Sequence, residues 1–131
     1  MSQIGKVLLD TNAVIAMFAK DAGIVRYVAD ADQYVAPCIV VGELIWGALK
    51  STKIDENLSL IEELLVDCDV LPCDGTTAKQ YGTIKNSLRV KGRPIPDNDI
   101  WIAATAIQYE LPLLTNDKHF HEVDGLTMVN W

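Results

Sequence analysis

Apolar residues follow two patterns along this chain, short unbroken runs and longer runs with helical spacing. Unbroken runs are typical of strands buried on both faces, and apolar residues three and four positions apart are typical of helices. Strands are therefore predicted over residues 6–9, 33–36, 69–71, 113–115 and 127–129. Helices are predicted over residues 13–18, 24–31, 38–49, 54–66, 74–90 and 97–107. No linker or internal repeat separates these elements, so residues 1–131 are predicted to form a single domain.

The first predicted strand runs directly into three polar residues, Asp10, Thr11 and Asn12. Catalytic and ligand-binding groups in open α/β sheets collect at the carboxyl ends of the strands. A carboxylate in that place is partly desolvated and needs a base, a hydrogen-bond cradle or a metal. Two interpretations of Asp10 stay open at this point: it caps the following helix, or it belongs to a site.

The strand predicted over residues 113–115 ends in the same way, with Thr115 followed by Asn116 and Asp117. If these two strands are parallel neighbours, their carboxyl ends meet at one edge of the sheet. Asp10 and Asp117 would then lie at the same edge.

Glu43 is the one charge in a helix that is apolar almost all round, residues 38–49, and that composition predicts a buried helix. Glutamate is rarely buried unless it is paired. Glu43 therefore either faces a polar cleft or meets a basic partner from elsewhere in the chain. We favour the cleft, because no lysine or arginine is near it in sequence.

Asp97 and Asp99 open the last predicted helix. Asp97 or Asn98 is a natural N-cap, and Asp99 falls in the first turn, where the helix dipole favours anions. Capping explains one aspartate but not two. The three alanines within residues 103–106 would let this helix approach its neighbours closely and bring the acid at its start near the sheet.

The working hypothesis is that Asp10, Glu43, Asp99 and Asp117 converge in one cleft. Carboxylates that converge repel one another, and a divalent cation removes that cost. Ligand sets made only of oxygen suit Mg²⁺ or Mn²⁺ rather than zinc, and such sites hydrolyse phosphodiester bonds. The flanking polar side chains would orient the carboxylates or a water molecule, and they are Thr11, Asn12, Thr115 and Asn116.

The net charge of −7 argues against purely electrostatic binding of nucleic acid, but not against a nucleic-acid enzyme whose metal supplies positive charge. Residues 77–96 hold only basic charges, among them Arg89, Lys91 and Arg93. This stretch is either a solvated helix face or a path that guides an RNA backbone to the acids.

Other features of the sequence indicate a protein of the reducing cytoplasm without a membrane anchor. The three cysteines form no close pair, which gives no disulfide framework. There is no signal-peptide core and no apolar run long enough to span a bilayer. His119 and His121 are interpreted as surface residues, and the tryptophans, such as Trp46, as packing residues.

Several motifs occur in order along nearly the whole chain. They are Leu8-Leu9-Asp10-Thr11-Asn12, Gly42-Glu43-Leu44 with Trp46-Gly47-Ala48, Lys91-Gly92-Arg93-Pro94-Ile95, the run 99–106, Leu114-Thr115-Asn116-Asp117 with Phe120, and Val129-Asn130-Trp131. Any one of them is weak, but together, at this spacing, they are specific. With these motifs the chain resembles PIN-domain proteins, and among them the VapC-type toxins of prokaryotic toxin–antitoxin pairs.

The resemblance implies an α/β fold of three layers, α/β/α, in which helices flank a central parallel sheet. It also implies an endoribonuclease that uses Mg²⁺ or Mn²⁺ and inhibits translation, with initiator tRNA as the substrate of the most similar-looking members. The family's acids fall on Asp10, Glu43, Asp99 and, least securely, Asp117. Asp97 is an additional acid, either a helix cap or a further metal ligand.

The resemblance further implies a homodimer and a VapB-type antitoxin whose C-terminal segment lies across the acidic cleft. Two other interpretations remain. The chain could be a housekeeping RNA-processing nuclease of the same fold, or a PIN domain that has lost its activity and serves as a protein-binding module. A complete set of acids argues against the inactive module.

Overall fold

The computed structural model describes residues 4–131, and all the predicted strands and helices are present in it. In chain order the elements are β1 (Ile4–Leu9), α1 (Thr11–Phe18), α2 (Ala22–Asp30), β2 (Ala31–Pro37), α3 (Cys38–Leu49), α4 (Ile54–Asp67), β3 (Asp69–Leu71), α5 (Gly75–Lys91), α6 (Asp97–Gln108), β4 (Leu113–Leu114), the 3₁₀ helix η1 (Lys118–Glu122) and β5 (Met128–Val129). The predicted boundaries differ from these by at most two residues, and those of α3 and β3 coincide. The 3₁₀ helix η1 was not predicted.

The five strands form one sheet in the order β3-β2-β1-β4-β5, and every neighbouring pair is parallel. Leu8 of β1 pairs with Val35 of β2 on one side and with Leu113 of β4 on the other. The predicted adjacency of the first and fourth strands is therefore confirmed. The strand order reverses between β1 and β4, and the crevice at the carboxyl ends of such strands is where open α/β sheets bind ligands.

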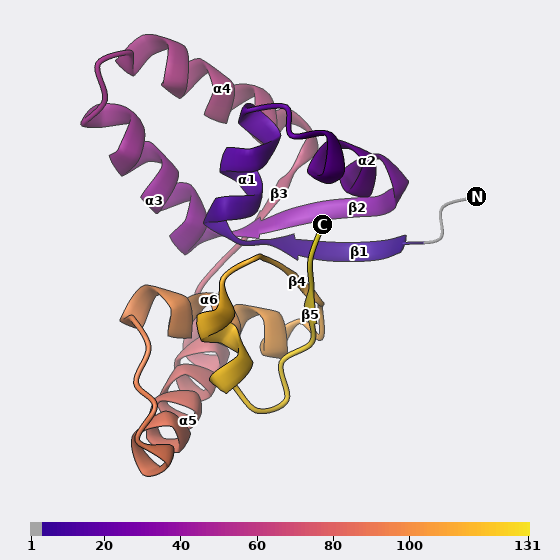
Figure 1. Cartoon of the computed structure of the whole chain (residues 1–131). Coiled ribbons are helices and arrows are strands. Elements are labelled where there is room, and N and C mark those ends of the chain that lie inside the picture. The colour runs from indigo at the N-terminus through magenta and orange to yellow at the C-terminus, as the bar shows by residue number, and fades with distance from the viewer. Residues whose placement is uncertain (1–3) are drawn as a thin grey trace.

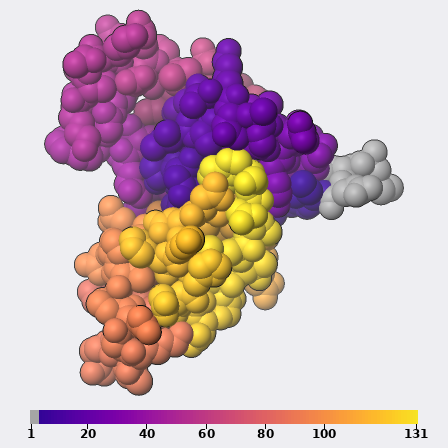
Figure 2. Space-filling view, viewed as in Figure 1, coloured from indigo at the N-terminus to yellow at the C-terminus, as the bar shows by residue number. Residues whose placement is uncertain are grey.

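Helices cover both sides of the sheet, as a three-layer α/β/α fold requires. Figure 1 shows α1 to α4 gathered in the upper half of the molecule and α5 and α6 in the lower half, with β1 and β2 between the two groups and β4 and β5 beside α6. The C-terminal residues also pack against the N-terminal part of the described chain. In Figure 2 the yellow C-terminal residues lie against the indigo N-terminal part, and a Cβ added at Gly23 of α2 would lie 3.3 Å from the Trp131 ring.

The core is built on β1 and α6. Val7, Leu8 and Leu9 are at most 1% exposed, as expected of a strand covered on both faces. In α6 the alanines within residues 103–106 are equally buried, so this helix packs closely against the sheet. Truncating a side chain such as Leu8 to alanine would cost about 2–5 kcal/mol of stability. The close packing of α6 brings its first turn to the edge of the sheet.

Three expectations about helices were wrong in detail. Helix α3 is not buried all round, because Ile45, Trp46 and Leu49 are 38%, 63% and 51% exposed. Trp46 is thus a surface residue with the Lys50 ammonium over its ring, rather than a packing residue. Helix α6 begins at Asp97 with Pro96 in the N-cap position, so no side chain caps it. Proline without an N–H and with a preset φ suits the start of a helix, and it leaves Asp97 free for other partners.

Within the part of the chain that is described, no helix is both long and apolar enough to cross a membrane.

Candidate active site

Asp10 lies at the carboxyl end of β1 and is only 5% exposed. One of its oxygens, Oδ1, accepts a hydrogen bond from the Thr11 backbone N–H at 2.8 Å, which makes Asp10 the N-cap of α1. The other oxygen, Oδ2, accepts a hydrogen bond from the Thr115 hydroxyl at 2.7 Å. Thr115 follows β4, so this bond joins the ends of the two central strands. The two interpretations of Asp10 are therefore compatible, because capping occupies one oxygen and the other faces β4.

Glu43 projects from the middle of α3 toward the start of α1. Its Oε1 accepts a hydrogen bond from the Thr11 hydroxyl at 3.2 Å. Among residues 4–131 no lysine or arginine forms an ion pair with Glu43, Asp10, Asp99 or Asp117. Glu43 therefore has no internal lysine or arginine partner among the described residues, and its charge interacts with Asp10 and Asp99.

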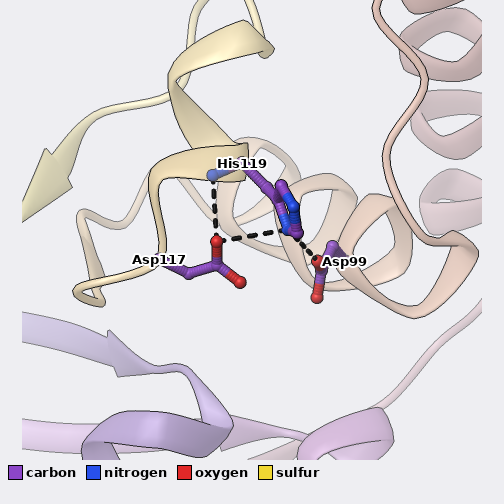
Figure 3. A group of neighbouring side chains, drawn as sticks. All are labelled: Asp99, Asp117 and His119. Carbon is purple, nitrogen blue, oxygen red and sulfur yellow. Dashed lines mark hydrogen bonds and ion pairs between the residues drawn. The ribbon is translucent and has the colours of Figure 1, made fainter.

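Asp99, Asp117 and His119 form the outer part of the same cluster (Figure 3). Asp99 comes from the first turn of α6, and Asp117 caps η1 by accepting a hydrogen bond from the His119 backbone N–H at 2.9 Å. The His119 imidazole lies between the carboxylates, with Nδ1 3.4 Å from Asp99 Oδ2 and 3.2 Å from Asp117 Oδ1. The Asp117 backbone N–H donates to the Thr115 hydroxyl at 3.0 Å, which links this part to Asp10.

The electrostatics of the cluster are those of carboxylates held together without a lysine or arginine among the described residues. Burial raises the pKa of Asp10, hydrogen bonds from Thr115 and Thr11 oppose the shift, and repulsion from Asp99 and Asp117 adds to it. The pKa of Asp99 is also raised, by burial and then by Asp117, and the His119 hydrogen bond and charge oppose the rise.

The pKa of Glu43 is raised by burial first, while the hydrogen bond from Thr11 opposes the shift and repulsion from Asp10 and Asp99 adds to it. The structure thus brings together all four of the predicted acids. A perturbed group of carboxylates in a crevice is a signature of a functional site.

The donor set fits a divalent cation. One ligand atom each from Asp99, Asp117 and His119 lies within 4.8 Å of the others, a spacing that one ion can bridge. Carboxylates that have no lysine or arginine partner gain from a cation, because it relieves both their burial and their repulsion. Oxygen donors suit Mg²⁺ and Mn²⁺, and an added imidazole nitrogen is better matched to Mn²⁺ than to Mg²⁺.

Two of the predicted site residues have other partners. The Asp97 carboxylate accepts hydrogen bonds from the Tyr81 hydroxyl and the Lys85 ammonium, both at 3.0 Å, so it is directed to α5 and not to the other acids. Lys91 is bound to Asp124 Oδ1 at 2.7 Å and to the Glu122 carbonyl at 2.8 Å. Its ammonium is already paired within the fold and is not a free contact for RNA.

The remaining predicted residues lie where the strands end or on the surface. Thr115 and Thr11 bond to the acids, and Asn12 Oδ1 is 3.5 Å from the Thr115 hydroxyl. Arg89 and Arg93 are exposed at the end of α5, which Figure 1 places at the tip of the molecule away from β1 and β2. Their role as an RNA path stays a prediction.

His119 is the residue that the sequence analysis missed. It is exposed, as expected for a surface histidine, but its ring lies against two of the acids. The available signal was its position two residues after Asp117, in a short segment that returns toward the sheet. This position indicates a contact with the acids only once the 3₁₀ helix η1 is known. Residues 118–122 show no apolar periodicity that predicts η1.

Comparison with known proteins agrees with this geometry. Residues 7–126 match the PIN domain family. A tRNA(fMet)-specific endonuclease VapC from Shigella flexneri is 33% identical over 129 residues, which cover 96% of this chain and 98% of that protein. The structure of VapBC-1 from nontypeable Haemophilus influenzae superposes with a TM-score of 0.87 at 31% identity, over 96% of this chain and 98% of the other.

A further solved structure is similar over the same length. VapBC2 from Rickettsia felis, bound to a DNA fragment from its promoter, superposes with a TM-score of 0.89 at 26% identity, and the match covers 96% of this chain and 98% of the other. Because the family match spans most of the chain and a relative above 30% identity is covered almost completely, this chain belongs to the PIN-domain family, among the VapC proteins.

Proposed function

We propose that this protein is the toxin of a toxin–antitoxin pair and acts as a metal-dependent endoribonuclease that hydrolyses RNA phosphodiester bonds and so inhibits translation. The observation that carries the proposal is the convergence of Asp10, Glu43, Asp99 and Asp117, without a lysine or arginine partner among the described residues, at the switch point of a PIN-domain sheet. The similarity to a tRNA(fMet)-specific endonuclease makes initiator tRNA the first substrate to test.

The side chains divide into two groups by their surroundings. Asp10, Asp99 and Asp117, with the nearby His119, would hold Mg²⁺ or Mn²⁺. Such an ion lowers the pKa of water and neutralises charge on a phosphate during in-line displacement. Glu43 has a raised pKa and a partner, Thr11, that fixes one of its oxygens, so it is suited to accept a proton from the attacking water.

A VapB-type antitoxin is the proposed protein partner, because the similar solved structures are VapBC complexes. A groove of about 490 Å³ between α1, α3 and α4 is lined by apolar residues such as Ile15, Phe18 and Leu60, and it reaches Glu43. An antitoxin segment with apolar side chains and one basic residue would fill this groove and place its charge among the acids. The homodimer stays a prediction.

The deciding experiment is cleavage of a total-tRNA pool by the purified protein, with Mn²⁺ or Mg²⁺, with chelator, and with Asp10→Asn as the matched variant. Discrete fragments that require both the metal and Asp10 are expected, and mapping their ends would identify the target. Equal behaviour of the wild type and the variant would contradict the proposal. A housekeeping nuclease would cut RNA but would not arrest growth on expression. A toxin would arrest growth, and co-expression of its antitoxin gene would relieve the arrest.

A further inference from the structure

A second cavity, of about 610 Å³, opens beside the acidic cluster at the carboxyl ends of β4 and β5. It shares Asp117 with the cluster, so any group bound in it is adjacent to the site proposed for the scissile phosphate. Its volume falls in the range of about 300–1,000 Å³ in which small ligands bind. The cavity is thus large enough for a nucleoside.

The walls offer flat apolar surface on one side. Tyr27 of α2 is half-buried, and Met128 of β5 contributes a thioether. Aromatic rings are the usual stacking partners of unpaired bases, and a methionine sulfur packs well against aromatic rings. The Tyr27 phenol is neutral at physiological pH already at its ordinary pKa of 10.0, and burial raises that pKa further.

The edge of the cavity offers hydrogen-bonding groups of both kinds. Asn116 follows β4 and Asn130 follows β5, and these strands are parallel neighbours in which Leu114 pairs with Val129. Each amide carries a donor and an acceptor, which is the combination that reads the edges of bases. Lys118 also lines the cavity, and a lysine there can supply positive charge for a phosphate.

We propose that this cavity binds one unpaired nucleotide of the RNA next to the scissile phosphate, with the base against Tyr27 and its edge facing Asn116 and Asn130. The proposal rests on the proposed ribonuclease function and deepens it. A base within a duplex is already stacked and paired, so it cannot enter such a cavity without being extruded. The protein would therefore select loops and single strands and would discriminate between bases at one position beside the cut.

The first test measures the base preference of cleavage on short single-stranded oligoribonucleotides with randomised sequence. Asn130→Ala is expected to flatten the preference at one position beside the cut and to leave the preference elsewhere unchanged. Asn86→Ala, an exposed asparagine on α5 outside the cavity, is the matched control and should keep the wild-type preference. An unchanged preference in Asn130→Ala would overturn the base-reading part of the proposal.

The second test measures binding without cleavage, in an Asp10→Asn background, by fluorescence anisotropy with a labelled single-stranded oligoribonucleotide. Tyr27→Leu is expected to weaken binding about tenfold, since stacking on an aromatic ring contributes about 1–3 kcal/mol per base. Tyr27→Phe keeps the ring and should bind as the Asp10→Asn parent does, and circular dichroism checks that each variant is folded.

The two tests separate this proposal from the proposed function. If the wild type does not cleave RNA with metal but Tyr27→Leu still weakens binding, the function is wrong and the cavity is an RNA-binding site. If the wild type cleaves but Tyr27→Leu binds as tightly as its parent, the cavity is not the nucleotide site. Binding lost equally in Tyr27→Phe and Tyr27→Leu would also overturn the stacking role.

Discussion

Asp97 and Asp99 lie two positions apart on the first turn of α6, yet their environments are opposite. Asp97 is exposed, and hydrogen bonds from Lys85 and then Tyr81 hold its pKa below the ordinary value. Asp99 is half-buried, and burial followed by repulsion from Asp117 raises its pKa. The difference shows that neither helix position nor residue type determines whether a carboxylate belongs to the site. The elements that pack beside the carboxylate determine it.

The region around Asp97 is a complete structural contact between α5 and α6. Tyr81 stacks on Trp101 with ring centroids 4.1 Å apart and 16° between the planes, and the Lys85 ammonium lies 5.5 Å from the Tyr81 ring centroid. Each charge there has a partner. The region around Asp99 gathers carboxylates whose basic partner is a histidine rather than a lysine or arginine, and a divalent cation would stabilise them. Variants in the two regions test this contrast.

The largest effect is expected for activity. Asp99→Asn removes a ligand from the proposed metal site and should lower kcat/KM for tRNA cleavage by about 10²–10³-fold, since metal assistance contributes several kcal/mol. Asp97→Asn is the matched control on the same helical turn and should stay within about twofold of the wild type. Cleavage rates at saturating Mn²⁺ measure both. Comparable losses in the two variants would show that the contrast has no functional meaning.

The next effect concerns the choice of metal. His119→Ala removes the nitrogen donor beside Asp99 and Asp117 and should weaken Mn²⁺ binding about tenfold, a usual cost for groups around a metal site, with a smaller loss for Mg²⁺ because Mg²⁺ prefers oxygen. Calorimetric titration of each metal into the protein without RNA measures this. His121→Ala, two residues along the same segment, controls for the loss of a histidine. Unchanged affinity for both metals would exclude His119 as a ligand, and equal losses would show that it does not favour Mn²⁺ over Mg²⁺.

A smaller effect is expected on stability as the pH changes. Because the pKa of Asp10 is raised by folding, the folded protein binds this proton more tightly than the unfolded chain. Asp10 therefore makes its full contribution to the free energy of unfolding below its ordinary pKa of 3.8. The contribution is lost as the pH rises through the raised pKa of the folded state. Without divalent metal at neutral pH, Asp10→Asn should melt roughly 3–5 °C above the wild type, the shift that about 1 kcal/mol produces in a domain of this size.

Thermal melts from pH 4 to pH 8 test this expectation. The gap between Asp10→Asn and the wild type should close toward pH 4 and should reverse when Mn²⁺ is added. A gap that does not change with pH would mean that the variant acts through its hydrogen bonds to Thr11 and Thr115 rather than through charge.

The smallest effect is expected at the paired region. Lys85→Met breaks the exposed ion pair with Asp97 and should lower the melting temperature by about 2 °C or less, because exposed pairs contribute little. Metal affinity should not change. In about 1 M salt, where such pairs are screened, the difference from the wild type should vanish. A loss of metal affinity in Lys85→Met would show that the contact also positions Asp99.

Much of the fold was predictable because local patterns determine it. The unbroken run that ends at Leu9 is buried as a central strand, and the Gly92 that ends α5 takes the left-handed conformation, with φ of 68°. The convergence of Asp10 and Asp117 was predictable too, because parallel neighbours end at one edge of a sheet.

The errors arose where the surroundings of a side chain depend on distant elements. Trp46 belongs to an apolar helix in sequence, but no element within residues 4–131 covers its face of α3, so it is exposed. Lys91 looks like a free cation in a basic stretch, but the turn after η1 brings Asp124 to it. His119 shows no pattern of its own, and only η1 turns its ring between Asp99 and Asp117.

The positions of the strands and helices and the choice of the four candidate acids follow from the sequence alone. The reason is that burial patterns and strand-end residues are properties of neighbouring positions in the chain. Only the tertiary structure decided which of Asp97 and Asp99 joins the acids. A pKa and a ligand set depend on the distances between groups, and these are established when α5, α6 and η1 pack beside the sheet. The cavity beside Asp117 also depends on tertiary structure, since its walls join Tyr27 of α2 to residues 115–130, which are far from it in the chain.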